Sequence, residues 1–242
     1  MAALPGAVIA FIVPAHNEAR LLPATLRALR EAADALGIGY RIVVVDDASD
    51  DSTGDMAQRH GAQVVRVEHR HIAATRNAGA HATAEAWLCF VDADTVIDAT
   101  VLAAALAALR GGAVGGGARV ELLGPLAWHE RLGQSFFAWT FRLAGIAPGC
   151  FLFCTRAAFD AAGGFDTRYY AGEDVALSRA LARLGRFVIL REPVRTSARK
   201  LRTFSAWEHL QLMLRFVGRR RRLLASREHL DLWYGRRRDE RD

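Results

Sequence analysis

The feature that most constrains the fold is an alternation of apolar runs with helical patterns in the first half of the 242-residue chain. Each run is nearly continuous in apolar residues, as expected of a strand buried on both faces. Strand-helix alternation of this kind predicts an α/β fold, with a Rossmann-like, mostly parallel central sheet and helices on both faces. The predicted strands are Ala7–Val13, Arg41–Val45, Ala62–Val67 and Ala86–Val91, and later helices are expected at Ile72–Ala84 and at Thr100–Arg110, with Asp98 as an N-cap.

The second half of the chain is less regular and ends in a basic segment. Residues 199–242 hold thirteen basic and six acidic residues, a net of +7, whereas the whole chain has +6. We expect one domain, residues 1–200, followed by a basic amphipathic helical extension, residues 201–242. The predicted elements of this half are a strand in "AVGGGARVELLG", overlapped by a flexible turn at Gly111–Gly117, an aromatic-rich helix at Leu126–Leu143, a strand in "CFLFCTR", a helix at Glu173–Leu184, a strand at Arg186–Leu190 and a tail helix from about Phe204.

Polar side chains follow three of the predicted strands, in the segments Pro14–Glu18, Asp46–Asp51 and Asp92–Thr95. Each segment alone fits an ordinary helix cap or turn. Together they are expected to meet, because ligands of open α/β sheets bind beyond the carboxyl ends of the strands. Clustered carboxylates repel one another unless a cation or a hydrogen-bond donor compensates them. This edge of the sheet is therefore a candidate binding site.

The "DADT" segment carries the most specific chemistry. Asp92 and Asp94 are two residues apart, so in extended backbone they point to the same side. Mg²⁺ and Mn²⁺ prefer such oxygen ligands and complete their shell with water and substrate phosphates. The chain has neither of the common glycine-rich phosphate-binding motifs, which disfavours dinucleotide and P-loop functions. A metal ion holding a nucleotide diphosphate is the chemistry that this segment favours.

With these residues assembled, the chain resembles the family 2 glycosyltransferases, which have the GT-A fold. The resemblance covers about residues 8–200. Six motifs carry it, in the expected order: "VPAHNE", "VVVDDASDDST", "ATRNAGA", "FVDADT", "GGFDTRYYAGEDVALSRAL" and "TSARK".

The resemblance implies an inverting transfer of a sugar from a nucleotide-diphosphate sugar, with UDP or GDP as first choices, to an unidentified acceptor hydroxyl or phosphate. Asp174 would be the general base. Asp94, with Asp92, would ligate Mn²⁺ or Mg²⁺, and the third ligand is not evident. The other implied site residues are Pro14, Ala15, Asn17, Glu18, Asp46, Asp47, Arg76, Asn77, Asp92 and Ala93 for the nucleotide, and Gly149, Cys150, Glu173, Arg199 and Lys200 for the acceptor and diphosphate.

Two alternatives stay open at this point. Asp92-Ala93-Asp94-Thr95-Val96 also fits the D-x-D-x-[TV] pattern of haloacid-dehalogenase-type phosphatases, but three strand-helix units precede it and Lys200, the one lysine, follows the later acidic pair instead of preceding it. A non-enzymatic protein would instead bind an anionic surface through the arginine-rich tail.

The resemblance itself implies no nucleic-acid partner. We expect a cytoplasmic protein, because no segment is long enough to span a bilayer. The three cysteines are expected to be reduced, because their spacing suits neither a disulfide nor a zinc site. Peripheral contact of the tail with the inner face of the membrane is left open.

Overall fold

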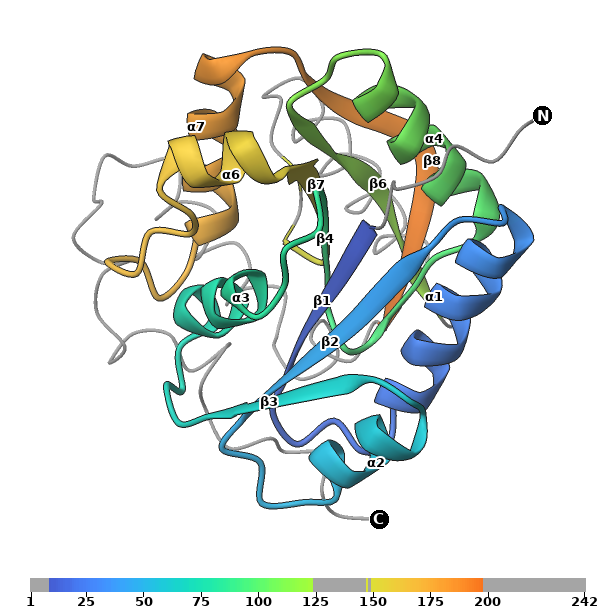
Figure 1. The fold of residues 1–242 in the computed structure, drawn as a ribbon. Coiled ribbons are helices and arrows are strands. Elements are labelled where there is room, and N and C mark those ends of the chain that lie inside the picture. Colours follow the sequence, from blue (N-terminus) through green and yellow to red (C-terminus); the bar gives the residue numbers. More distant parts are fainter. Residues whose placement is uncertain (1–8, 124–146, 148, 198–242) are drawn as a thin grey trace, which may run out of the picture.

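The computed structural model describes residues 9–123, 147 and 149–197, which form a three-layer α/β/α sandwich (Figure 1). Within these residues the central sheet has eight strands in the order β3-β2-β1-β4-β7-β6-β8-β5. The strands are β1 (Ile9–Ala15), β2 (Tyr40–Asp47), β3 (Gln63–Val67), β4 (Trp87–Val91), β5 (Thr95–Val96), β6 (Gly115–Leu123), β7 (Phe151–Thr155) and β8 (Phe187–Ser197). The helices are α1 (Leu22–Ala35), α2 (Thr53–Arg59), α3 (Ile72–His81), α4 (Ala99–Arg110), α6 (Arg156–Ala162) and α7 (Glu173–Leu184).

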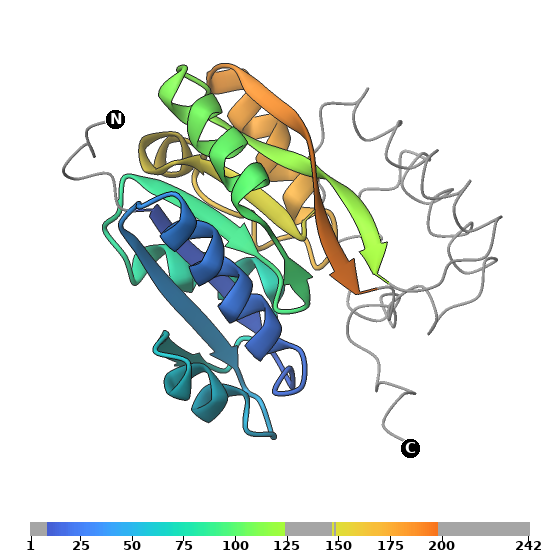
Figure 2. The ribbon, with the colours of Figure 1, turned by 90° about the vertical axis from the view of Figure 1, so that its right-hand side faces the viewer.

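The first four strands pair in parallel, as the strand-helix alternation predicts. Strand β7 lies between β4 and β6 and is antiparallel to both. Strands β6 and β8 are parallel to each other (Figure 2). The short β5 is antiparallel to β8. The sheet is thus mixed: β3, β2, β1 and β4 form a parallel block, and the antiparallel β7 separates it from the parallel pair β6 and β8.

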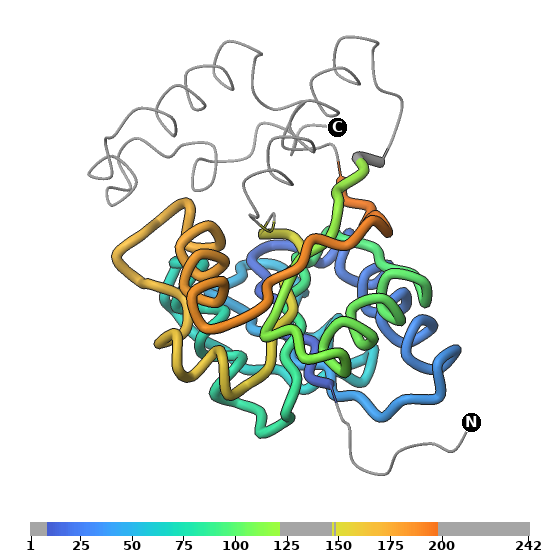
Figure 3. Tube along the Cα trace, turned by 90° about the horizontal axis from the view of Figure 1, so that it is seen from above, coloured from blue at the N-terminus to red at the C-terminus, as the bar shows by residue number. Residues whose placement is uncertain are grey.

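Helices cover both faces of the sheet, which explains why the central strands are apolar throughout. In β1, Phe11 and Val13 join a core with α1, α2 and α4, whereas Ala10 and Ile12 join a second core with α3, α6 and α7. Successive side chains of a strand point to opposite faces. Every residue of β1 is therefore buried. Viewed from above, the two helical layers flank the strands (Figure 3).

Two predictions about the second half of the domain are wrong. Gly115–Gly117 are not part of a flexible turn: they lie in β6, as the strand predicted in "AVGGGARVELLG" requires, and pair with β7 and β8. A Cβ on Gly115 would lie 2.8 Å from the carbonyl oxygen of Phe153, so the glycines permit close packing. The last strand reaches Ser197 instead of ending at Leu190. The second half of this strand is mostly polar and partly exposed, so it lacks the apolar run from which the other strands were predicted.

The three cysteines are free, as predicted, with Cys89 and Cys154 buried and Cys150 half-buried. In the part of the chain that the structure describes, no helix is long and apolar enough to cross a membrane. The helix predicted at 126–143, the basic extension, Arg199 and Lys200 lie outside the described residues.

Candidate active site

The carboxyl ends of β2, β1 and β4 lie side by side, as predicted. Ala15 at the end of β1 pairs with Asp46 of β2, and Asp92 directly follows β4 on the other side of β1. The three polar segments after these strands therefore share one edge of the sheet. This edge is the candidate site.

The loops after β1 and β2 are held together by hydrogen bonds. The backbone N–H of Asn17 donates to Ser49 Oγ at 3.0 Å, and Asn17 Oδ1 accepts from the backbone N–H of Asp50 at 2.8 Å. The backbone N–H of Glu18 donates to Thr53 Oγ1 at 2.8 Å. Asn17 has a φ of 53°, a left-handed conformation that asparagine tolerates better than most residues. Asn17 therefore holds the loops after β1 and β2 together, independently of any contact that it makes with a ligand.

Asp47 anchors the start of α3. Its carboxylate accepts from the backbone N–H groups of Arg70 at 2.7 Å and His71 at 3.1 Å, and from Thr75 Oγ1 at 2.7 Å. A carboxylate here also interacts favourably with the positive end of the helix dipole. Asp47 thus joins β2 to the N-terminus of α3.

Other residues predicted to line the nucleoside pocket are buried in the same edge. Pro14 and Ala15 end β1, and Ala93 lies between the two aspartates. Asp46 points towards α2, where a Cβ on Gly54 would lie 2.6 Å from its Oδ2.

The two aspartates of "DADT" have different partners. Asp92 Oδ1 accepts from Arg76 Nη2 at 2.9 Å, and the Asp92 N–H donates to the Cys150 carbonyl at 3.1 Å. Asp94 Oδ1 accepts from the Thr196 hydroxyl at 3.3 Å, near the end of β8. The segment is thus fixed from two sides, by α3 and by β8.

Arg76 is the centre of a buried charge cluster. The residue is 3% exposed. Its Nη1 donates to Glu173 Oε1 at 2.6 Å, and its Nη2 donates to Asp92 Oδ1 and, at 2.8 Å, to the Gly149 carbonyl. The cluster therefore brings together Asp92, which follows β4, and Glu173, the first residue of α7, with Gly149 beside them.

The acidic pair at the start of α7 completes this cluster. Burial, together with the charge of Asp174, raises the pKa of Glu173 from 4.5 to about 7, although Arg76 opposes the shift. Burial likewise raises the pKa of Asp174, again against the effect of Arg76. A Cβ on Gly149 would lie 2.8 Å from Asp174 Oδ2, so this carboxylate packs directly on the glycine. Three carboxylates, those of Asp92, Glu173 and Asp174, lie close to the single guanidinium of Arg76. This excess of negative charge favours protonation of a carboxylate or binding of a cation.

The candidate metal-binding side chains at this edge are those of Asp92 and Asp94. Among residues 9–123, 147 and 149–197, no group of three or more His, Cys, Asp or Glu side chains is arranged to hold a metal ion. Asp92 and Asp94 provide two hard oxygen donors. Mg²⁺ in particular is usually bound by one or two carboxylates plus substrate phosphates, so this donor set fits an ion shared with a diphosphate.

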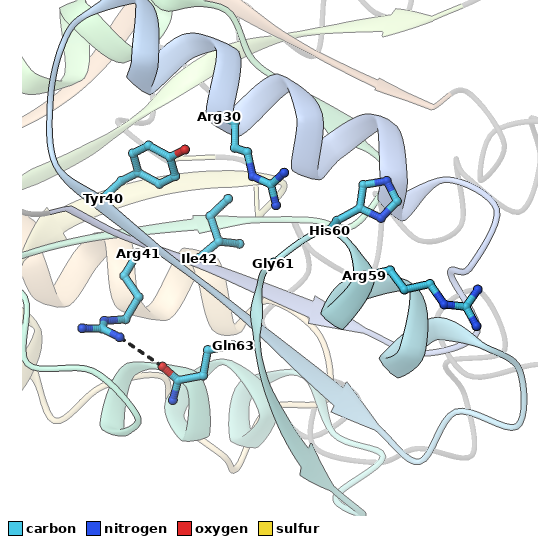
Figure 4. A pocket seen from close by; sticks show the side chains of 8 residues that line it. All are labelled: Arg30, Tyr40, Arg41, Ile42, Arg59, His60, Gly61 and Gln63. Carbon is cyan, nitrogen blue, oxygen red and sulfur yellow. Dashed lines mark hydrogen bonds between the residues drawn. The ribbon is translucent and has the colours of Figure 1, made fainter.

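A hollow of about 570 Å³ lies elsewhere, at the opposite ends of β2 and β3 (Figure 4). Arg41 at its rim forms an ion pair with Glu85 at 2.6 Å and reaches Gln63 at 3.5 Å. The hollow is therefore separate from the charge cluster around Arg76. Its lining residues are Arg30, Tyr40, Arg41, Ile42, Arg59, His60, Gly61 and Gln63.

Most of the predicted site residues that the structure describes lie together at this edge of the sheet. Three further residues, which were not predicted, form hydrogen bonds with them. Thr75 binds Asp47, Thr196 binds Asp94, and Phe165 binds Asn77 through its backbone. Thr75 and Thr196 lie inside two of the quoted motifs, which was the available signal. Phe165 lies in "GGFD", directly after two glycines with positive φ.

Comparison with known proteins identifies the family. The profile described as glycosyl transferase family 2 matches residues 10–161. Uncharacterized glycosyltransferases of Mycobacterium tuberculosis and Mycobacterium bovis are 33% identical over 141 residues, or 57% of this chain and 62% of theirs. The chain thus spans less than two thirds of the length of these curated relatives.

Solved structures share the fold at low sequence identity. TarS 1–349 of S. aureus in complex with UDP is 17% identical, with a TM-score of 0.62 over 88% of this chain and 71% of that one. The mannosyltransferase PcManGT of Pyrobaculum calidifontis, in complex with GDP-Man and Mn²⁺, is 21% identical, with a TM-score of 0.63 over 84% and 61%. The phosphatase alternative is thereby set aside: the chain has the GT-A fold and belongs to glycosyl transferase family 2.

Proposed function

We propose that this protein is an inverting glycosyltransferase that uses a nucleotide-diphosphate sugar and a divalent metal ion, with Asp174 as the general base. The observation that carries the proposal is the cluster around Arg76. It joins Asp92, which begins the donor-side "DADT" segment, to Glu173, the neighbour of Asp174. A reaction between a donor and an acceptor needs both sets of groups within one site.

The donor would lie along the shared edge of β2, β1 and β4. Asp94 and Asp92 would hold Mn²⁺ or Mg²⁺, which stabilises the negative charge of the departing diphosphate. UDP and GDP are the first nucleotides to test, because the two structural relatives bind UDP and GDP-Man. Arg199 and Lys200 remain candidates for direct contact with the diphosphate.

Asp174 would act on the acceptor. As the acceptor oxygen attacks the anomeric carbon, the bond from that carbon to the diphosphate breaks and Asp174 takes the hydroxyl proton. Attack from the face opposite the leaving group inverts the anomeric centre. Burial raises the pKa of Asp174 and thereby makes it a stronger base than an exposed aspartate.

Binding of the donor is the first experiment. Thermal shift and calorimetry with UDP, GDP and dTDP, each with and without Mn²⁺, should show one nucleotide that stabilises the protein in a metal-dependent way. Asp94→Ala should lose the metal-dependent part of this binding. Asp98→Ala, which removes a carboxylate four residues away at the α4 N-cap, is the matched control and should bind normally. Metal-independent binding that Asp94→Ala leaves intact would contradict the metal assignment.

A further inference from the structure

We propose that Arg76 and Asn77 are positioning residues that hold the two ends of the loop preceding Asp174, instead of binding the nucleotide. The loop is residues 165–173. It begins at Phe165, next to α3, and ends at Glu173, the first residue of α7. The inference rests on the proposed function, because it assigns these residues to the orientation of Asp174.

Asn77 binds the backbone at the beginning of this loop in both directions. Its Nδ2 donates to the Phe165 carbonyl at 2.8 Å, and its Oδ1 accepts from the Phe165 N–H at 2.9 Å. The preceding Gly164 has a φ of 73°, and a Cβ there would lie 2.9 Å from Asn77 Oδ1. The Asn77 amide thus occupies the space that a side chain at position 164 would fill. Both of its hydrogen bonds, one donated and one accepted, join it to the backbone of Phe165.

The ring of Phe165 is fixed as well. It packs edge-on against Phe90 of β4 with ring centroids 4.9 Å apart, and Phe159 of α6 lies 6.1 Å away. The Arg76 guanidinium lies 5.2 Å from the centroid of the same ring, within cation–π distance. Consecutive residues of α3 therefore hold the backbone and the side chain of Phe165.

Arg76 holds the other end of the loop through its short bond to Glu173. A buried guanidinium with several fixed partners defines their geometry more narrowly than a flexible ammonium would. Since Glu173 and Asp174 are adjacent, the position of the first constrains that of the second. The Gly149 carbonyl, which also accepts from Arg76, places the surface on which Asp174 packs.

Helix α3 is suited to this role because it is itself held tightly on the sheet. A Cβ on Gly79 would collide with Ile12 and Val45, so the glycine brings the helix close to β1 and β2. Thr75, one residue before Arg76, is bonded to the buried Asp47. The motif "ATRNAGA" thus contains an anchor to the sheet, two residues that bind the loop, and a glycine that permits close packing.

The decisive variant is Asn77→Ala, because Asn77 contacts the loop and does not take part in the charge cluster. Hydrogen exchange of the Phe165 amide should accelerate by roughly tenfold or more, since its acceptor is lost. Asn77→Asp keeps that oxygen, so its Phe165 exchange should lie between those of the wild type and Asn77→Ala. Unchanged Phe165 exchange in Asn77→Ala would overturn the proposal, whatever the activity.

Kinetics then separate positioning from nucleotide binding. With UDP-GlcNAc and GDP-mannose as probes and water as acceptor, kcat for nucleoside diphosphate release should fall by about tenfold or more in Asn77→Ala. The Kd for the nucleotide should stay within about threefold of wild type. A nucleotide Kd raised tenfold with kcat unchanged would instead show that Asn77 seats the nucleoside, and the proposal would be wrong.

The control is Thr83→Ala. Thr83 Oγ1 accepts from Arg156 Nη2 at 2.9 Å and so joins the segment after α3 to the start of α6, away from the charge cluster. Its loss should leave Phe165 exchange and kcat unchanged. If the wild-type protein binds none of the nucleotides tested, the proposed function fails, while the exchange experiment still decides whether Asn77 clamps the loop.

Discussion

Glu173→Gln should change the pH dependence of folding stability by an amount that follows from the charge cluster. The pKa of Glu173 is raised from 4.5 to about 7, so the folded state holds its proton more tightly than the unfolded state. Stability should therefore fall as pH rises from about 4.5 to 7. A shift of about 2.5 pH units corresponds to roughly 3 kcal/mol in the free energy of unfolding. Glutamine does not titrate and should remove this loss.

Urea unfolding of both proteins at pH 5 and pH 8, without nucleotide, measures the difference. Between these two pH values the wild type should lose about 2 to 3 kcal/mol more than Glu173→Gln. Glu121→Gln, at an exposed ion pair with Arg119, is the control and should leave the pH dependence nearly unchanged. Parallel pH curves for the wild type and Glu173→Gln would refute the raised pKa of Glu173.

Three further substitutions test separate parts of the structure. Gly149→Ala should lower donor turnover by at least tenfold with nucleotide affinity retained, because the new Cβ would lie 2.8 Å from Asp174 Oδ2, as kinetics and calorimetry can check. Gly115→Ala should destabilise the fold by about 1–3 kcal/mol in urea unfolding, because its Cβ would meet the Phe153 carbonyl at 2.8 Å. Asp98→Ala should cost about 1 kcal/mol in the same assay, because two N-cap hydrogen bonds to α4 are lost. A wild-type value of turnover or of unfolding free energy would contradict the corresponding prediction.

Most of the fold could be predicted because its signals are local. The apolar runs gave the parallel strands, and Asp98 caps α4 as the sequence indicates. Helix α7 has the predicted bounds, Glu173–Leu184. The failures concern long-range packing. Gly115–Gly117 fit both a turn and the strand predicted in "AVGGGARVELLG", and only the neighbouring β7 and β8 explain why glycine is needed in this strand.

The composition of the candidate site was predictable, whereas its internal bonding was not. The parallel strands required Asp46 and Asp92 to share an edge of the sheet, and they do. The bond between Arg76 and Glu173 spans 97 residues of sequence, and neither residue carries a local signal for the other. Motif resemblance predicts a nucleotide-binding role for Arg76, whereas we propose from its contacts that it orients the acidic pair.

The role of Asp174 as the general base is best tested by turnover and nucleotide binding of Asp174→Asn, measured on the same sample. Nucleotide affinity should stay within about threefold of wild type, and donor turnover should fall by about a hundredfold or more, because the general base is removed. Asp160→Asn makes the same charge change at an exposed position of α6 and should retain wild-type turnover. Asp174→Asn turnover at the wild-type rate would contradict the assignment of the base.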